Sequence, residues 1–94
     1  MYQLNVWLTV KDAADVPAIR AHLSEQQRLS RLEPGCVRFE VYHSESDPRR
    51  FLLHEHWESK QAWEVHRTAK AFLEIYQPHV LPKVDREPHV CQML

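Results

Sequence analysis

The stretch CVRFEVYHSESDPRRFLLHEHW, residues 36–57, contains two segments typical of strands, 36–43 and 51–57, on either side of one polar segment. Alternation over 36–43 predicts a half-buried strand whose apolar face carries Val37, Phe39 and Val41. Asp47-Pro48 is a typical turn signal, and the apolar segment 51–57 follows it. The stretch therefore predicts a β-hairpin.

The segment before the hairpin predicts a strand and a helix. Residues 2–10 alternate strictly, with Leu4, Val6, Leu8 and Val10 on one face. Residues 12–33 predict a helix that Asp12 or Asp15 caps and that the Glu-Pro-Gly turn at 33–35 ends. Its apolar stripe runs through Val16, Ile19, Leu23, Gln26 or Gln27, and Leu29 or Leu32.

The segment after the hairpin predicts a second helix over 58–77 and a last strand. Ser59 is the expected cap, and Pro78 and Pro82 are expected to end the helix. One helical stripe contains Ala62, Trp63, His66, Ala69 or Lys70, Phe72 or Leu73, and Tyr76. The final strand is short and begins after Pro88.

The predicted order is β-α-β-β-α-β, which is the ferredoxin-like arrangement of an α+β domain with an antiparallel sheet. A chain of 94 residues forms one domain, 1–94. Two helices cover one face of such a sheet and leave the other open. That open face carries Asn5, Trp7 and Tyr42, and a second copy packing sheet to sheet would cover it. We therefore expect a homodimer with a barrel-like interface.

Composition narrows the class of function. The net charge of −1 gives no basic surface for nucleic acid, and no apolar run is long enough to cross a membrane. Cys36 and Cys91 are far apart in the sequence and form no CxxC pair, so we expect reduced thiols in small buried positions and a cytoplasmic protein. A single glycine excludes a glycine-rich phosphate loop.

The segment EPGCVRFEVYHSESDPRRFLLHEHWESKQAWEVHRTAKAF, residues 33–72, resembles the antibiotic biosynthesis monooxygenase family. The likeness is carried by an E-P-G-C turn, a D-P turn, an F-x-L-x-E-x-W strand and a W-E-S-x-x-A-x-x-x-H helix start. Here these are Glu33 to Cys36, Asp47-Pro48, Phe51 to Trp57, and Trp57 to His66. No single element is specific to the family, whereas the ordered set is.

The resemblance implies a dimeric α+β barrel and a small enzyme without a cofactor. Some members oxygenate quinol-like or phenolic aromatic molecules with O2, and relatives isomerise a phosphorylated signalling sugar or degrade haem. The fold alone does not fix the reaction. Many members carry Pro-His-Phe after the helix histidine, and this chain has Ala69-Lys70-Ala71-Phe72 instead. The positions that the haem-degrading branch uses are Val6, His66 and Tyr76 here, and Asn5 is one place off on the opposite face, which argues against haem degradation.

His66 is the leading catalytic candidate, and a hydrogen-bonded structural histidine is the alternative. Tyr76 is the second catalytic candidate, because its hydroxyl could donate a hydrogen bond to a substrate oxygen. Glu55 lies on an apolar strand face, where a carboxylate needs a partner. The preferred explanation is a salt bridge to Arg38, to Arg20 or to a second chain. The alternative is that Glu55 is a catalytic base with a raised pKa. Aromatic side chains would wall a substrate pocket between the helices and the sheet: Phe39, Trp57, Trp63 and Phe72.

His54 and His56 share a strand face opposite Glu55, away from His66, so we expect no metal site. The expected function is a cofactor-independent monooxygenase of a quinol- or phenol-like substrate. One alternative is an isomerase of a phosphorylated sugar, with Lys70, Arg67 and Arg38 as the phosphate clamp. The other is a dimeric ligand-binding module without turnover.

Overall fold

A computed structural model describes residues 1–94 and confirms the predicted order of strands and helices. Two short 3-10 turns (η1 and η3) and a π-helix (η2) add to the strands and α-helices. In chain order the elements are β1 (Tyr2–Val10), η1 (Ala13–Asp15), α1 (Val16–Ser30), β2 (Cys36–His43), β3 (Arg50–Trp57), α2 (Lys60–His66), η2 (Ala71–Val80), η3 (Leu81–Lys83) and β4 (Val84–Cys91).

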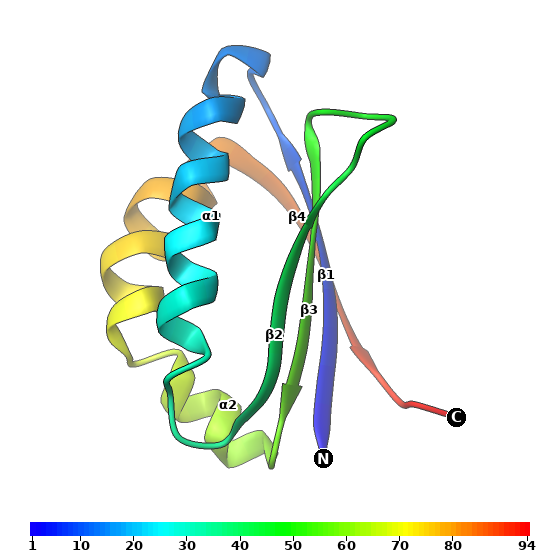
Figure 1. Cartoon of the computed structure of the whole chain (residues 1–94), viewed down its shortest axis with the longest axis vertical. Coiled ribbons are helices and arrows are strands. Elements are labelled where there is room, and N and C mark those ends of the chain that lie inside the picture. The colour runs from blue at the N-terminus through cyan, green and yellow to red at the C-terminus, as the bar shows by residue number, and fades with distance from the viewer.

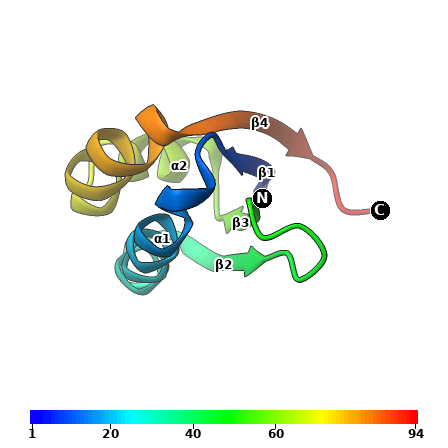
Figure 2. The ribbon, with the colours of Figure 1, turned by 90° about the horizontal axis from the view of Figure 1, so that it is seen from above.

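The four strands form one antiparallel sheet in the order β2-β3-β1-β4. The helical segments cover one face of this sheet, with α1 and η2 side by side (Figures 1 and 2). This is the α+β ferredoxin-like fold. No helix combines the length and the apolar character that a membrane span requires.

The core lies between the helices and the sheet, as the alternation predicts. Leu4, Val6, Leu8 and Val10 of β1 are all buried, and Ile19 and Leu23 of α1 pack against them. The other core residues are Phe39 of β2, Phe51, Leu53 and Trp57 of β3, Tyr76 and Val80 of η2, and Val84 of β4. Burying these side chains supplies the main stabilisation of so small a domain.

The predicted continuous second helix is wrong, because α2 ends at His66 and a turn precedes η2. Thr68 closes this turn: its Oγ1 donates a hydrogen bond to the carbonyl of Val65 at 2.7 Å, and its backbone N–H donates to the same carbonyl at 2.9 Å. A hydroxyl side chain that bonds locally competes with helix propagation. The prediction that Pro78 ends the helix is also wrong. The wider π-helix η2 passes through Pro78 and ends at Val80.

The last strand begins earlier than predicted, at Val84, and it contains Pro88. Because β4 is an edge strand, a proline can lie in it without removing a hydrogen bond that a further strand would need. The earlier start places Arg86 opposite Leu8 of β1, on the helix-covered face. This position makes Arg86 available to the site described below.

Three smaller predictions also need correction. Val37 is exposed, because an irregularity between Cys36 and Arg38 breaks the alternation of β2. Leu32 is exposed, because α1 ends at Ser30, before the position where Leu32 would join its apolar stripe. Cys91 is exposed at the end of the edge strand, whereas Cys36 is partly buried.

Gly35 fixes the turn between α1 and β2 against the start of α2. Its φ of 80° lies in the left-handed region, which favours glycine. A Cβ atom at this position would lie 2.6 Å from the Cβ of Ala62, and the Gly35 carbonyl accepts a hydrogen bond from the N–H of Glu58 at 2.8 Å. The turn therefore packs tightly on α2, which brings Glu33 next to His66.

Candidate active site

A small cavity lies on the helix-covered side of the sheet, where α1, β3, α2, η2 and β4 meet. Its lining combines aromatic and ionisable side chains: Gln26, Leu53, Glu55, Trp63, His66, Arg67, Phe72, Tyr76 and Arg86. Its volume of about 20 Å³ is enough for roughly one water molecule. An adjoining cleft of about 180 Å³ shares Trp63, Arg67, Phe72, Tyr76 and Arg86 with it.

Arg67 of the turn after α2 and Phe72 of η2 line both the cavity and the cleft. The guanidinium of Arg67 lies 5.2 Å from the centre of the Trp63 ring and 5.6 Å from that of Phe72. Arg67 is exposed and Phe72 is partly buried, so both have room to move. A ligand larger than a water molecule can enter if these side chains rotate toward solvent and join the two spaces.

His66 lines the cavity and is held by Glu33, which lies outside the lining. Its Nδ1 lies 2.6 Å from Oε1 of Glu33, and both side chains are largely buried, at 4% and 13% exposure. A carboxylate accepts hydrogen bonds, so this contact assigns the Nδ1 proton to His66 and leaves Nε2 as an acceptor. A buried imidazole fixed in this way by a carboxylate is the arrangement of a positioned general base.

Glu55 lies deep in the cavity wall with one direct hydrogen bond. The indole N–H of Trp57 donates to Oε1 of Glu55 at 3.0 Å. Burial raises the pKa of the Glu55 carboxyl, and the Trp57 hydrogen bond, the His66 ring in its protonated form and the Arg86 guanidinium offset part of that rise. The predicted salt bridges within the chain do not form, since Arg38 pairs with Glu40 and Arg20 with His43. A salt bridge to a second chain stays a prediction, and the raised pKa agrees with the alternative explanation.

Tyr76 and Arg86 form a second polar pair in the lining. The Arg86 Nε–H donates to the Tyr76 hydroxyl at 3.1 Å, which leaves the hydroxyl proton free to donate elsewhere. Burial raises the pKa of Tyr76, so the hydroxyl stays protonated at neutral pH. The pair can therefore offer a hydrogen bond to an oxygen in the cavity.

The structure brings five of the seven predicted site residues into the cavity lining: Glu55, Trp63, His66, Phe72 and Tyr76. Phe39 and Trp57 do not line it and lie behind His66, with ring centres 5.8 Å and 4.5 Å from the imidazole. These two rings support the wall and do not form its surface.

Four polar residues of the site were missed as site residues. In the sequence Glu33 is only part of the turn signal, and Gln26 is only a candidate for the helix stripe. Arg86 was missed because the last strand was expected to begin after Pro88. Arg67 was predicted only as part of a phosphate clamp, and it lines both the cavity and the cleft.

The structure does not gather the predicted phosphate clamp. Arg67 lines the cavity, whereas Lys70 is exposed outside it and Arg38 pairs with Glu40 at 3.5 Å. Arg38 pairs in register with His56, on the face away from the cavity. Arg86 is the second cation that the cavity contains.

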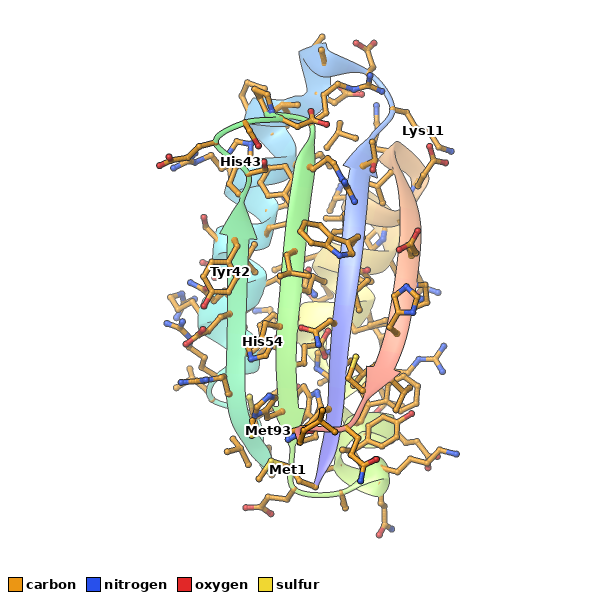
Figure 3. The ribbon with its side chains drawn as sticks, turned by 90° about the vertical axis from the view of Figure 1, so that its right-hand side faces the viewer. Met1, Lys11, Tyr42, His43, His54 and Met93 are labelled. Atoms are coloured by element: carbon orange, nitrogen blue, oxygen red, sulfur yellow. The ribbon has the colours of Figure 1, made fainter.

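The remaining histidines lie apart from the cavity. His54 is on the open face of the sheet (Figure 3), where its Nδ1 lies 2.7 Å from Oδ1 of Asn5. The ring centres of His54 and His56 are 4.7 Å apart. No three histidine, cysteine or acidic side chains cluster in a way that could hold a metal ion. The haem-branch position Val6 is a fully buried aliphatic residue, and Asn5 faces the opposite side, as predicted.

Two other features are poorer candidates for a reactive centre. An open groove of about 570 Å³ runs between α1 and the β2–β3 hairpin, but its lining has no buried ionisable side chain. Burial raises the pKa of the Cys36 thiol to about 11, which makes it a weak nucleophile at neutral pH. The cavity at His66 is therefore the best candidate for the active site.

The fold and the cavity place the protein among small α+β domains in which aromatic and ionisable side chains line a cavity beside an antiparallel sheet. The profile of the antibiotic biosynthesis monooxygenase family matches residues 1–78. The chain belongs to this family. The predicted resemblance and the predicted fold are thus confirmed.

Individual proteins are similar to this chain in sequence or in fold. The uncharacterized protein YjcS of Bacillus subtilis strain 168 is 26% identical over 85 residues, which cover 90% of this chain and 80% of YjcS. A structure of a candidate antibiotic biosynthesis monooxygenase from Nitrosomonas europaea is similar with a TM-score of 0.91 and 24% identity, covering 100% of this chain and 99% of that one. Rv0793 from Mycobacterium tuberculosis has a TM-score of 0.86 and 22% identity, covering 100% and 96%. The two structures show similarity of fold alone.

Proposed function

We propose that the protein is a cofactor-independent monooxygenase that oxidises a quinol- or phenol-like aromatic molecule with O2. The observation that carries this proposal is the hydrogen bond between Glu33 and His66 at the wall of an aromatic cavity. It supplies a positioned base where a phenol would bind. Family membership supports the same class of reaction.

The first step is removal of the phenolic proton by Nε2 of His66. Glu33 stabilises the imidazolium that forms, because its carboxylate accepts the Nδ1 hydrogen bond. The phenolate is rich in electrons and reacts with O2 at a ring carbon that carries hydrogen. One oxygen atom stays on the ring as a carbonyl, and the other leaves as water with two hydrogens from the substrate, so that the ring is oxidised by four electrons as O2 is reduced.

The other polar groups suit a substrate that becomes negatively charged. The Tyr76 hydroxyl, positioned by Arg86, can donate a hydrogen bond to the developing oxyanion. Burial favours the protonated form of Glu55, which keeps a second negative charge away from the phenolate. The rings of Trp63 and Phe72 would hold the substrate and exclude water.

The two alternatives find less support in the cavity. An isomerase of a phosphorylated sugar would have only Arg67 and Arg86 as cations, since Lys70 and Arg38 lie elsewhere. A binding module without turnover would not need the base at His66. Binding of a phosphosugar but no naphthoquinol would favour the first, and tight binding without product would favour the second.

A homodimer through the open face of the sheet is part of the proposal. Tyr42 on this face is 53% exposed, and Arg50 lies 4.6 Å from the centre of the Trp7 ring (Figure 3 shows the face). Burying such aromatic surface against a second copy would be favourable. Sedimentation as a monomer at all concentrations would contradict this assembly. We place the protein in the cytoplasm, since Cys36 and Cys91 are both free.

Oxygen uptake tests the proposed activity. A reduced naphthoquinol should consume O2 faster with the protein than by autoxidation, and His66→Ala should abolish the difference. The matched control is His22→Ala, since His22 stacks on His79 at the surface of the helices, away from the cavity. Uptake at the autoxidation rate with folded wild-type protein, or full activity of His66→Ala, would show that the proposal is wrong.

A further inference from the structure

One polar atom in the cavity wall has no partner. Gln26 lies on the buried face of α1, which otherwise presents Ile19 and Leu23, and it is 1% exposed. Its Oε1 makes no hydrogen bond within the chain. Burying an amide oxygen without a partner is unfavourable, so native proteins rarely do it away from a binding site.

The neighbouring polar groups of the cavity are already engaged. Trp57 donates to Glu55, Glu33 accepts from His66, and Arg86 donates to Tyr76. Gln26 lines the same cavity, which has space for roughly one water molecule at about 20 Å³. Gln26 therefore differs from these side chains, because its Oε1 is a buried acceptor with no hydrogen bond at all, which a ligand or water can supply.

We propose that Gln26 determines specificity by accepting a hydrogen bond from a second hydroxyl of the bound aromatic molecule. This inference rests on the proposed function and narrows it. One hydroxyl of the substrate meets His66, and the other displaces the water and donates to Gln26. The preferred substrate class is then a dihydroxyarene, that is, a hydroquinone, over a monophenol or a methyl ether.

A second unpartnered atom provides the matched control. The Ser30 Oγ also has no partner, and Ser30 is fully buried on the same face of α1, one turn beyond Gln26. Ser30 does not line the cavity. Replacing either Gln26 or Ser30 by an apolar residue removes one unpartnered polar atom from the buried face of α1. Only the replacement of Gln26 should change which ligand is preferred.

Binding without O2 separates recognition from turnover. Quenching of tryptophan fluorescence would be measured anaerobically with a naphthohydroquinone, with its monomethyl ether and with a naphthol as a control for size. The methyl ether keeps both oxygens but loses the second donor. The wild-type protein should bind the hydroquinone about 10-fold more tightly, the ratio expected from one hydrogen bond to a buried group. Gln26→Met should reduce this ratio to about 1 without weakening naphthol binding, and Ser30→Ala should keep it.

Each outcome decides the proposal. Equal binding of hydroquinone and ether by the wild-type protein, or an unchanged preference in Gln26→Met, overturns the role of Gln26 and leaves the proposed oxidation intact. The comparison of the two ligands on the wild-type protein needs no variant. Equal binding there contradicts the proposal even if Gln26→Met fails to fold. Absence of binding by all three compounds overturns the proposed function together with this inference.

Discussion

Glu33→Gln tests the base most specifically, because it keeps the size of the side chain and removes its charge. In the structure Glu33 Oε1 lies 2.6 Å from Nδ1 of His66, and both side chains are largely buried, so water screens the pair poorly. Hydrogen bonds to charged groups contribute about 1.5–3 kcal/mol. If the imidazolium loses this stabilisation when it forms, the rate of oxygen uptake falls about 10- to 150-fold.

The assay is the initial rate of oxygen uptake with a reduced naphthoquinol, after subtraction of autoxidation. Glu58→Gln is the control, since Glu58 is exposed at the same turn and its backbone N–H bonds to Gly35. Urea unfolding shows whether each variant remains folded. A folded Glu33→Gln protein with the wild-type rate would refute the role assigned to the pair.

Three further predictions concern the turn, the buried carboxyl and the oxyanion donor. Gly35→Ala should lower the free energy of unfolding by at least about 2 kcal/mol, because alanine disfavours the positive φ and its Cβ would meet Ala62 at 2.6 Å; calorimetry should show a Tm roughly 8–16 °C lower. Because burial raises the folded-state pKa of Glu55, the stability that depends on its protonated form is full below its ordinary pKa of 4.5 and is lost as pH rises through the folded pKa. Glu55→Gln, which can still accept from Trp57, should flatten this fall in chemical denaturation across pH, and an unchanged pH profile would contradict the assignment. Tyr76→Phe should lower kcat about 10- to 100-fold with little change in KM, which steady-state kinetics would show, since the lost hydrogen bond forms with the oxyanion.

The first three strands could be predicted from the sequence because apolar side chains recur on one face of each, whereas β4 (VDREPHVC) has no apolar face of this kind. β1 shows this most clearly, since Leu4, Val6, Leu8 and Val10 are all buried. The irregularity in β2 could not be predicted, because Val37 fits the apolar pattern and only the pairing with β3 exposes it. Pairing between strands is a tertiary property that local alternation does not encode.

The second helix shows a different limit. Its apolar stripe continues from Trp63 to Tyr76, but the local hydrogen bonds of Thr68 interrupt the helix between them. The stripe still predicted the right side chains for the cavity, because both segments turn the same face toward the sheet. Pro78 misled the prediction, since proline usually ends an α-helix and here lies within a π-helix.

Site residues could be predicted when the pattern of a single helix or strand indicated them. They were missed when their place in the site depends on a contact between elements far apart in the sequence. His66 and Tyr76 lie on a helical stripe that the sequence displays. The contact of Glu33 with His66 joins residues 33 positions apart, and it depends on the tight packing of Gly35 against Ala62. Arg86 reaches Tyr76 only because β4 pairs along the full length of β1.

The central claim is that His66 removes a proton from a phenol bound in the cavity. A nitrophenol tests it without any oxidation, because its phenolate absorbs visible light and its phenol form does not. At a pH where the free compound is mostly protonated, binding to the wild-type protein should produce the phenolate spectrum, and binding to His66→Gln should not. A bound nitrophenol that stays protonated on the wild-type protein, or that ionises equally on His66→Gln, would contradict the claim.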